Sequence, residues 1–240
     1  MRFRAALTSD APAVAALHAD SWRRYYRGAY ADAYLDGDID ADRLAIWSAR
    51  LTAADSRRVT IVAETDALVP PRPRSAPVTS TAGIDGMTRA GEDAPGEPAT
   101  PDDAAWRTGA ATQSDTRQLA TAASTLVGFV HLVVDDDPRW GSLIDNLHVL
   151  TGRQRGGVGS ALIRRAAEAA AERGALPGLY LWVQEQNTAA QAFYAAHGGQ
   201  VVETAQIEPP GGVPGRLHGR PRKLRVAWPD ARTVARPPRP

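Results

Sequence analysis

A glycine-rich turn between an apolar run and an alanine-rich run is the feature that most constrains this chain. The turn occupies residues 156–159 (Gly-Gly-Val-Gly), and the run after it continues to about Arg173, where Gly174 marks the end of a helix. Glycines let the backbone approach a ligand closely, and the free N–H groups of a first helical turn attract anions. The sequence therefore predicts a pyrophosphate site here, with Arg155 pairing a second charge. A ligand-free connection between a strand and a helix is the alternative.

Two common nucleotide-binding motifs fit this turn poorly. A Rossmann Gly-x-Gly-x-x-Gly turn needs a small residue where this chain has Leu162, and the acidic residue expected at the end of the next strand is absent. A P-loop needs a lysine followed by serine or threonine after the glycines, and no such pair is present. Both nucleotide interpretations are therefore disfavoured.

Hydrophobic periodicity predicts alternating strands and helices on both sides of a long interruption. Asp10 is the expected N-cap of the first helix, with Pro12 in its first turn. The expected strands are 2–7, 59–63, 126–134, 143–150, 179–183, 200–207 and 223–228, and the expected helices follow Asp10, surround residues 44–51, and span 156–173 and 188–198. This order predicts a single domain over residues 1–228.

The interruption covers residues 66–124, which are rich in Pro, Thr, Ser, Gly and Asp and poor in large apolar residues. Such a composition cannot offset its own ordering entropy, so it predicts a disordered insertion in a surface hairpin or a linker. Residues 229–240 form a tail rich in proline and arginine, which is typical of an extended, solvated end.

Composition narrows the possible functions. A formal net charge of +1 gives no strong field for phosphate backbones, so we expect no nucleic acid partner. The absence of cysteine excludes disulfides, thiolate metal sites and an acyl-cysteine intermediate, and five scattered histidines give no support to a metal site. No apolar run approaches the roughly 20 residues of a membrane span. We expect a cytoplasmic protein with no metal and no membrane partner.

The segment 154–159, Gln-Arg-Gly-Gly-Val-Gly, resembles the signature Gln/Arg-x-x-Gly-x-Gly/Ala of the GNAT superfamily of acyl-CoA N-acyltransferases. Residues 146–149 (Asn-Leu-His-Val) resemble the family's fourth strand, and residues 187–194 resemble its Asn-x-x-Ala-x-x-Phe-Tyr segment. The resemblance spans roughly residues 126–203. It implies an α/β (α+β) fold with a mixed, mostly antiparallel sheet flanked by helices, and a V-shaped splay between the fourth and fifth strands.

The resemblance also implies acetyl-CoA as co-substrate, with its pantetheine arm in the splay and its diphosphate on the glycine turn. The residues implied to bind it are Leu147, Val149, Gln154, Arg155, Gly156, Gly157, Val158, Gly159, Ser160 and Asn187. Asn187 is equally well explained as a residue that begins a helix. Tyr194 matches the family's tyrosine that protonates the departing thiolate; the alternative is that Phe193 and Tyr194 are core aromatics.

The amine also needs a base, for which Asp145, His148, Glu185 and Glu203 compete. We take Asp145 as the candidate catalytic base, with an exposed strand-end carboxylate as its alternative and a structural role as the alternative for His148. Strand alternation predicts that Asp145 and His148 point to opposite faces unless a bulge resets the register.

Two positions depart from the family pattern. Some ribosomal-protein N-terminal acetyltransferases place a glutamate base where this chain has Trp182, which disfavours that subfamily. The family usually has phenylalanine after the glycine that ends the last helix of the motif, whereas this chain has Gly199, which predicts looser packing there.

The expected function is transfer of an acetyl group from acetyl-CoA to a primary amine of a small molecule or protein, by direct attack in a ternary complex. The alternatives are a non-catalytic acyl-CoA-sensing module, a different acyl donor, or an O-acyl acceptor. The acceptor stays unidentified; Trp22, Tyr25, Tyr26 and Tyr30 either line its pocket or serve as core and surface aromatics. Pairing of two subunits into a homodimer also stays open.

Overall fold

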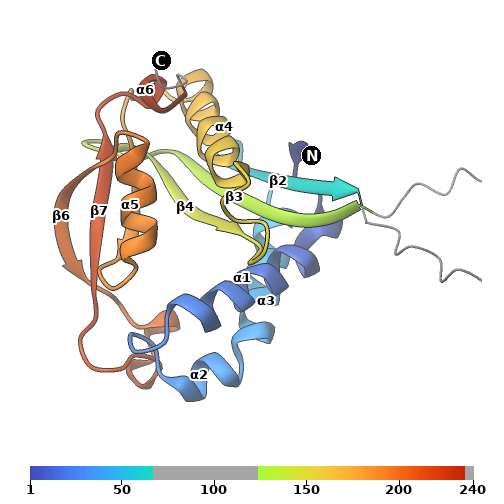
Figure 1. Cartoon of the computed structure of the whole chain (residues 1–240), viewed down its shortest axis with the longest axis vertical. Helices are drawn as coiled ribbons and strands as arrows, with labels where there is room; N and C mark the ends of the chain where they lie inside the picture. The colour runs from blue at the N-terminus through green and yellow to red at the C-terminus, as the bar shows by residue number, and fades with distance from the viewer. Residues whose placement is uncertain (67–123, 236–240) are drawn as a thin grey trace, which may run out of the picture. The chain divides into compact units, whose positions relative to one another are not determined.

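The computed structural model describes residues 1–66 and 124–235, which form seven strands in a single sheet with helices on both faces (Figure 1). The predicted insertion at residues 66–124 lies almost entirely outside the described residues. On either side of it, Asp66 pairs with Ser124 across two neighbouring antiparallel strands. The strands are β1 (Arg2–Ala5), β2 (Arg58–Asp66), β3 (Ser124–Asp137), β4 (Gly141–Val149), β5 (Leu179–Gln184), β6 (Gln200–Gln206) and β7 (Arg222–Trp228).

The spatial order of the sheet is β1-β2-β3-β4-β5-β7-β6, and β4 and β5 are its one parallel pair. This confirms the mostly antiparallel mixed sheet that the family resemblance implied. Only three residues of β4, Ser142 to Ile144, pair with β5. Beyond Ile144 and Leu181 the two strands separate, so the V-shaped splay lies at their carboxyl ends.

Helices α4 (Val158–Arg173) and α5 (Thr188–Ala196) share a core with one face of the sheet, while α1 (Ala11–Tyr25) and α3 (Ile39–Thr52) pack on the opposite face. The first core contains Leu162, Ile163 and the alanines of α4. The second is centred on Trp47 and Phe129, whose rings lie edge to face at 4.9 Å. From Phe129 onward, β3 contributes Phe129 to the second core and Val130, Leu132 and Val134 to the first, as the strand's two-residue period requires.

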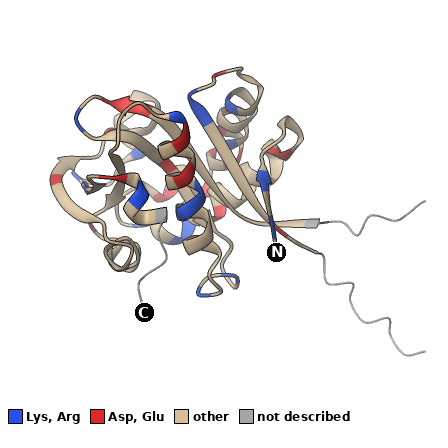
Figure 2. Cartoon of the chain, turned by 90° about the horizontal axis from the view of Figure 1, so that it is seen from above, with Lys and Arg blue, Asp and Glu red and all other residues tan. Residues whose placement is uncertain are grey.

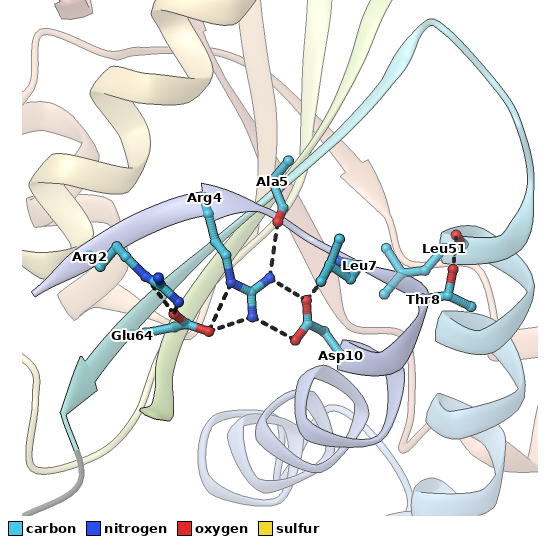
Figure 3. Close-up of polar contacts among 8 residues, drawn as sticks. All are labelled: Arg2, Arg4, Ala5, Leu7, Thr8, Asp10, Leu51 and Glu64. Carbon is cyan, nitrogen blue, oxygen red and sulfur yellow. Dashed lines mark hydrogen bonds and ion pairs between the residues drawn. The ribbon is translucent and has the colours of Figure 1, made fainter. Parts of the chain in front are cut away.

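A network of charges fastens β1 to β2 and to the start of α1 (Figure 3). Arg4 bonds to both Glu64 and Asp10, and its Nη1 lies 2.6 Å from Asp10 Oδ2. Asp10 stands at the predicted N-cap position, yet its carboxylate accepts from Leu7 N at 2.7 Å and from Arg4 rather than from the helix. Hydrogen bonds from Arg4 lower the pKa of both carboxyl groups. The Asp10 carboxylate therefore ties the helix to the sheet.

Several short elements were not predicted from the sequence. They are helix α2 (Asp32–Asp36), the 3-10 turns η1 (Thr8–Asp10), η2 (Pro210–Gly212) and η3 (Pro214–Arg216), and helix α6 (Ala231–Ala235). Within the stretch expected to be an extended, solvated tail, Ala231 and Val234 are buried against the core that contains α4. The proline-rich and arginine-rich composition of this stretch gave no indication that these two apolar residues would be buried.

The expected looseness at Gly199 is wrong. A Cβ atom built on Gly199 would lie 2.6 Å from atoms of both Trp228 and Val226, so the indole of Trp228 already fills the space. Trp228 Nε1 also donates to the carbonyl oxygen of His197 at 2.8 Å, which holds the ring in place. Trp228 of β7 thus occupies the space that the family's usual phenylalanine at position 199 would be expected to fill.

Basic and acidic residues are distributed over many elements of the described fold (Figure 2), in keeping with the small net charge. None of the helices in residues 1–66 and 124–235 is long and apolar enough to cross a membrane.

Candidate active site

A cleft of about 520 Å³ opens where β4 and β5 separate. Its walls come from the carboxyl halves of both strands, the glycine turn, α5 and the end of α1. Lining residues include Tyr26, Asp145, Asn146, Leu147, His148, Val149, Gln154, Arg155, Gly157, Gly159, Ser160, Trp182, Gln184, Asn187 and Tyr194. The splay therefore provides a cavity that meets the start of a helix.

The glycine turn delivers the start of α4 to this cleft. Gly157 is the N-cap of α4 with φ of 80°, a left-handed conformation that favours glycine. Gly159 lies beneath Phe193, whose ring would come within 3.3 Å of an added Cβ atom. The first-turn N–H groups of a helix that starts in a cavity form an anion site.

Gln154 holds the turn in place. Its Nε2 atom donates to the hydroxyl of Tyr25 at 2.8 Å and to the carbonyl oxygen of Val149 at 3.3 Å. The glycine turn is thereby fastened both to α1 and to the end of β4. Tyr25, which the sequence offered only as one of four possible pocket residues, has this positioning contact.

Most of the residues predicted to bind the cofactor meet at the cleft. Eight of the ten line it, whereas Gly156 and Val158 do not. Val158 is 3% exposed and packs in the core beneath the turn. Asn187 lines the cleft and also caps α5, because its side chain accepts from Ala190 N at 3.1 Å. Both alternatives given for Asn187 are compatible with this placement.

A family model for acetyltransferases of the GNAT family matches residues 88–199. Residues 88–199 therefore match a GNAT acetyltransferase domain. This similarity supports acyltransferase activity. No curated protein matches the chain at a significant level.

Solved structures with the same fold cover almost the whole chain at low sequence identity. The PaiA N-acetyltransferase of Thermoplasma acidophilum, solved with coenzyme A, is 14% identical over 95% of this chain and 98% of its own, with a TM-score of 0.56. A GCN5-related N-acetyltransferase of Rhodopseudomonas palustris is 18% identical over 94% and 93%, with a TM-score of 0.54. NAA60 of Arabidopsis thaliana, solved with a bisubstrate analogue, is 15% identical over 95% and 96%, with a TM-score of 0.52.

Tyr194 of the GNAT domain lies on α5 with its side chain in the wall of the cleft. Its ring packs against Phe193 and Trp228, so it is also a core aromatic. Burial raises the pKa of Tyr194 to about 12, so the phenol is protonated at neutral pH. Its hydroxyl bonds to none of the described residues, which leaves the proton free for transfer.

A β-bulge in β4 decides how the candidate bases are arranged. His131 of β3 pairs with Asn146, but Leu132 pairs with Ile144, so Asp145 has no partner on β3. The extra residue resets the alternation, and Asp145 and His148 both face the helices α1 and α3. Regular alternation would have placed the two side chains on opposite faces. Because the bulge is present, they share one face.

The carboxylate of Asp145 makes an ion pair and a hydrogen bond within the protein. Arg50 Nη1 of α3 lies 2.7 Å from its Oδ2 atom, and Asn146 Nδ2 donates to the same oxygen at 2.7 Å. His148 is half-buried at the cleft wall beside His18, with the two ring centroids 4.6 Å apart. Burial lowers the pKa of His148 to about 4, so its imidazole is neutral at pH 7.

The other two candidate bases lie outside the cleft. Glu185 approaches Arg222 at 3.7 Å, and Glu203 pairs with Arg225 at 2.8 Å. Neither residue lines the cavity between β4 and β5. The site therefore brings together Tyr194, Asp145 and His148 and leaves the two glutamates apart.

The aromatic residues at the end of α1 divide between the two roles considered. Tyr25 and Tyr26 line the cleft, whereas Trp22 and Tyr30 pack into a separate apolar cluster with Tyr34. Tyr26 takes part in both, because its ring also packs against Trp22 and stacks on Tyr30. Burial raises the pKa of Tyr26, so this phenol is protonated.

Sequence reasoning missed Gln184, the last residue of β5. It lines the cleft, is only 7% exposed, and neither polar atom of its carboxamide makes a hydrogen bond of good geometry to any described residue. A polar residue at the end of an otherwise apolar strand (Leu-Tyr-Leu-Trp-Val-Gln) was the signal that could have revealed it.

Proposed function

We propose that this protein is an N-acetyltransferase that moves an acetyl group from acetyl-CoA to a primary amine by direct attack in a ternary complex. The observation that supports this most strongly is the cleft itself. A parallel strand pair separates at its carboxyl end, a glycine-capped helix begins at the opening, and a buried tyrosine stands in the wall. Coenzyme A in the PaiA structure and the bisubstrate analogue in the NAA60 structure are consistent with this choice of co-substrate.

In this proposal the backbone holds acetyl-CoA. The N–H groups at the start of α4, from Gly157 to Ser160, receive the diphosphate, and Arg155 adds a positive charge. The backbone of β4 from Leu147 to Val149 is free of β5, so it can pair with the pantetheine arm. Holding the thioester beside an amine makes the attack effectively intramolecular.

The chemistry needs two proton transfers. The amine nitrogen forms a bond to the carbonyl carbon, the carbon–sulfur bond breaks, and the sulfur takes a proton. Tyr194 is the proposed donor of that proton, because burial keeps its phenol protonated. Asp145 is the proposed base for the amine, held on the bulge by Arg50. The neutral imidazole of His148 stands on the same face as a second acceptor.

Calorimetric titration with acetyl-CoA tests the proposed cofactor site. We expect saturable binding by the wild-type protein and loss of at least about tenfold in affinity in Gly157→Trp, because an indole would block the anion site. Gly152→Trp is the matched control. Gly152 also has φ of 80° and open space around it, but it does not line the cleft.

Equal binding by the wild type and both variants would show that acetyl-CoA does not bind at the glycine turn. No binding by a well-folded wild-type protein would remove the acetyltransferase proposal altogether. Loss in Gly157→Trp with retention in Gly152→Trp would support the proposed site and justify a screen of amines.

A further inference from the structure

A second cavity, of about 280 Å³, lies beside the end of β5. Three chain segments build it: the connection from α1 to α2, the residues at and after the end of β5, and the connection from β6 to β7. The lining residues are Gly28, Ala29, Gln184, Glu185, Gln186, His218, Arg220, Pro221 and Arg222. None of them belongs to the glycine turn or to α5.

Hydrogen bonds between these segments hold the cavity together. Gln186 Nε2 donates to the carbonyl oxygens of Tyr25 and Arg27, at 3.1 and 2.9 Å. His218 N donates to the carbonyl oxygen of Ala29 at 2.9 Å. The connections after α1 and before β7 are thus joined to each other, and the first is joined to the end of β5.

Gln184 is the one described residue that lines both cavities. The larger cavity is also lined by the glycine turn and Tyr194, whereas none of those residues lines the smaller one. A molecule in the smaller cavity would therefore contact a residue that also lines the cleft.

The carboxamide of Gln184 is suited to receive such a molecule. Its Oε1 and Nε2 atoms are buried and make no hydrogen bond of good geometry to the described residues, although the carboxamide lies close enough to the Tyr30 hydroxyl to offset part of the rise that burial causes in the pKa of that phenol. An amide without such bonds is costly to bury, whereas a ligand amine could donate to Oε1 and an acceptor group could bond to Nε2. The polar atoms at this junction are therefore incomplete without a polar ligand.

The charges around the smaller cavity favour an anion. Arg220 and Arg222 line it with Glu185 as the one carboxylate, and Arg222 approaches Glu185 at 3.7 Å. Arg220 bonds to an uncharged partner, with its Nη2 atom 3.1 Å from Gln206 Oε1. The exposed His218 adds a third nitrogen-bearing side chain. The Arg220 guanidinium thus retains donors for a carboxylate or a phosphate.

We propose that the smaller cavity receives the acceptor, and that Arg220 selects an amine that carries an anionic group while Gln184 positions its nitrogen at the cleft. This inference rests on the proposed N-acetyltransferase function and specifies its acceptor class. The amine enters from the side of the β6–β7 connection, and its anionic group stays at the arginines.

The experiment measures acetylation of matched amines by release of the coenzyme A thiol. Glycine, β-alanine and 4-aminobutanoate are each compared with their carboxamides, and aminoethyl phosphate is compared with ethanolamine. We expect kcat/KM for at least one anionic amine to exceed that of its neutral partner by about tenfold or more, the range expected for one charged hydrogen bond. The two arms separate a carboxylate preference from a phosphate preference.

Variants test whether the preference for anionic amines depends on Arg220. Arg220→Gln should reduce the anionic advantage to about twofold or less by raising KM, and Arg220→Lys should restore part of it. Arg57→Gln, which removes an exposed arginine that lines neither cavity, should leave the advantage unchanged. Gln184→Leu should lower kcat/KM for both members of a pair, with the affinity for acetyl-CoA unchanged.

The outcomes distinguish this inference from the function on which it rests. Normal acetyl-CoA binding with no preference for anionic amines, or an equal loss in Arg220→Gln and Arg57→Gln, would overturn the inference alone. Turnover of none of the amines by a protein that binds acetyl-CoA would also overturn it. Failure of the wild type to bind acetyl-CoA would overturn the proposed function and the inference together.

Discussion

Tyr194 combines a packing role with the proton donation that we propose for it. Its ring is part of the core formed with Trp228, while its hydroxyl lies in the cleft wall without a described partner. The apolar surroundings that bury the ring also raise the pKa of the phenol to about 12. The phenol therefore carries its proton throughout the neutral range, as the proposed protonation of a departing thiolate requires.

Removal of the Tyr194 hydroxyl should slow the proposed acetyl transfer. In Tyr194→Phe we expect kcat to fall by about 100-fold with acetyl-CoA affinity retained, because the ring packing is kept and only the proton donor is lost. Steady-state kinetics and calorimetry measure the two quantities. Tyr180→Phe is the control, since its hydroxyl bonds to Asp136 and it does not line the cleft. A kcat near the wild-type value in Tyr194→Phe would assign the tyrosine to packing alone.

At the scale of elements, the segment from α5 to β6 depends on a residue supplied by β7. The Trp228 indole occupies the space beside Gly199 and donates to the carbonyl oxygen of His197. The end of α5 is thereby held against the sheet, which keeps Tyr194 and Phe193 at the cleft. A glycine at position 199 is required by this contact.

We expect Gly199→Ala to lower the free energy of unfolding by about 2 kcal/mol, because a methyl group there overlaps Trp228 and Val226. Urea unfolding followed by tryptophan fluorescence measures the change. Gly215→Ala is the matched control, since an added Cβ atom meets nothing within 4 Å and the backbone φ is not positive. Equal stability of the two variants would contradict the packing explanation.

For the whole molecule, two buried histidines and one half-buried histidine make the stability of the fold depend on pH. His18, His131 and His148 lie between the sheet and α1 and α3, and burial lowers the pKa of each one, to about 4 for His131 and His148. Below about pH 6.5 these imidazoles take up protons in the unfolded chain but stay neutral in the fold. The free energy of unfolding should therefore fall as the pH decreases from about 6.5 towards 4.

Urea unfolding at half-unit pH intervals from 7.5 to 4.5 measures this dependence. The slope should decrease by up to about 1.4 kcal/mol per pH unit in His148→Phe, which removes one titrating group while keeping an aromatic ring. His218→Gln, at an exposed position, should keep the wild-type slope. A stability that does not change between pH 6.5 and 5 would show that these histidines are not held neutral by burial.

Local patterns in the sequence predicted most of the elements because each element depends mainly on neighbouring residues. The strands, the glycine turn and the long helices appear close to their expected positions, and the family resemblance implied the mostly antiparallel sheet and its splay. The glycine turn could be predicted from the sequence because an anion site at a helix start needs only backbone N–H groups and small residues, which lie together in the chain. Eight of the ten implied cofactor residues meet at one cleft for the same reason.

The tertiary structure alone decided which side chains meet across the cleft. Whether Asp145 and His148 share a face depends on a bulge, and a bulge is defined by hydrogen bonds to a partner strand that the local pattern does not contain. The same holds for the pairing of Arg50 with Asp145, for Trp228 beside Gly199, and for the buried Gln184 that lines both cavities. Each of these contacts joins residues far apart in the sequence, so only the folded chain reveals it.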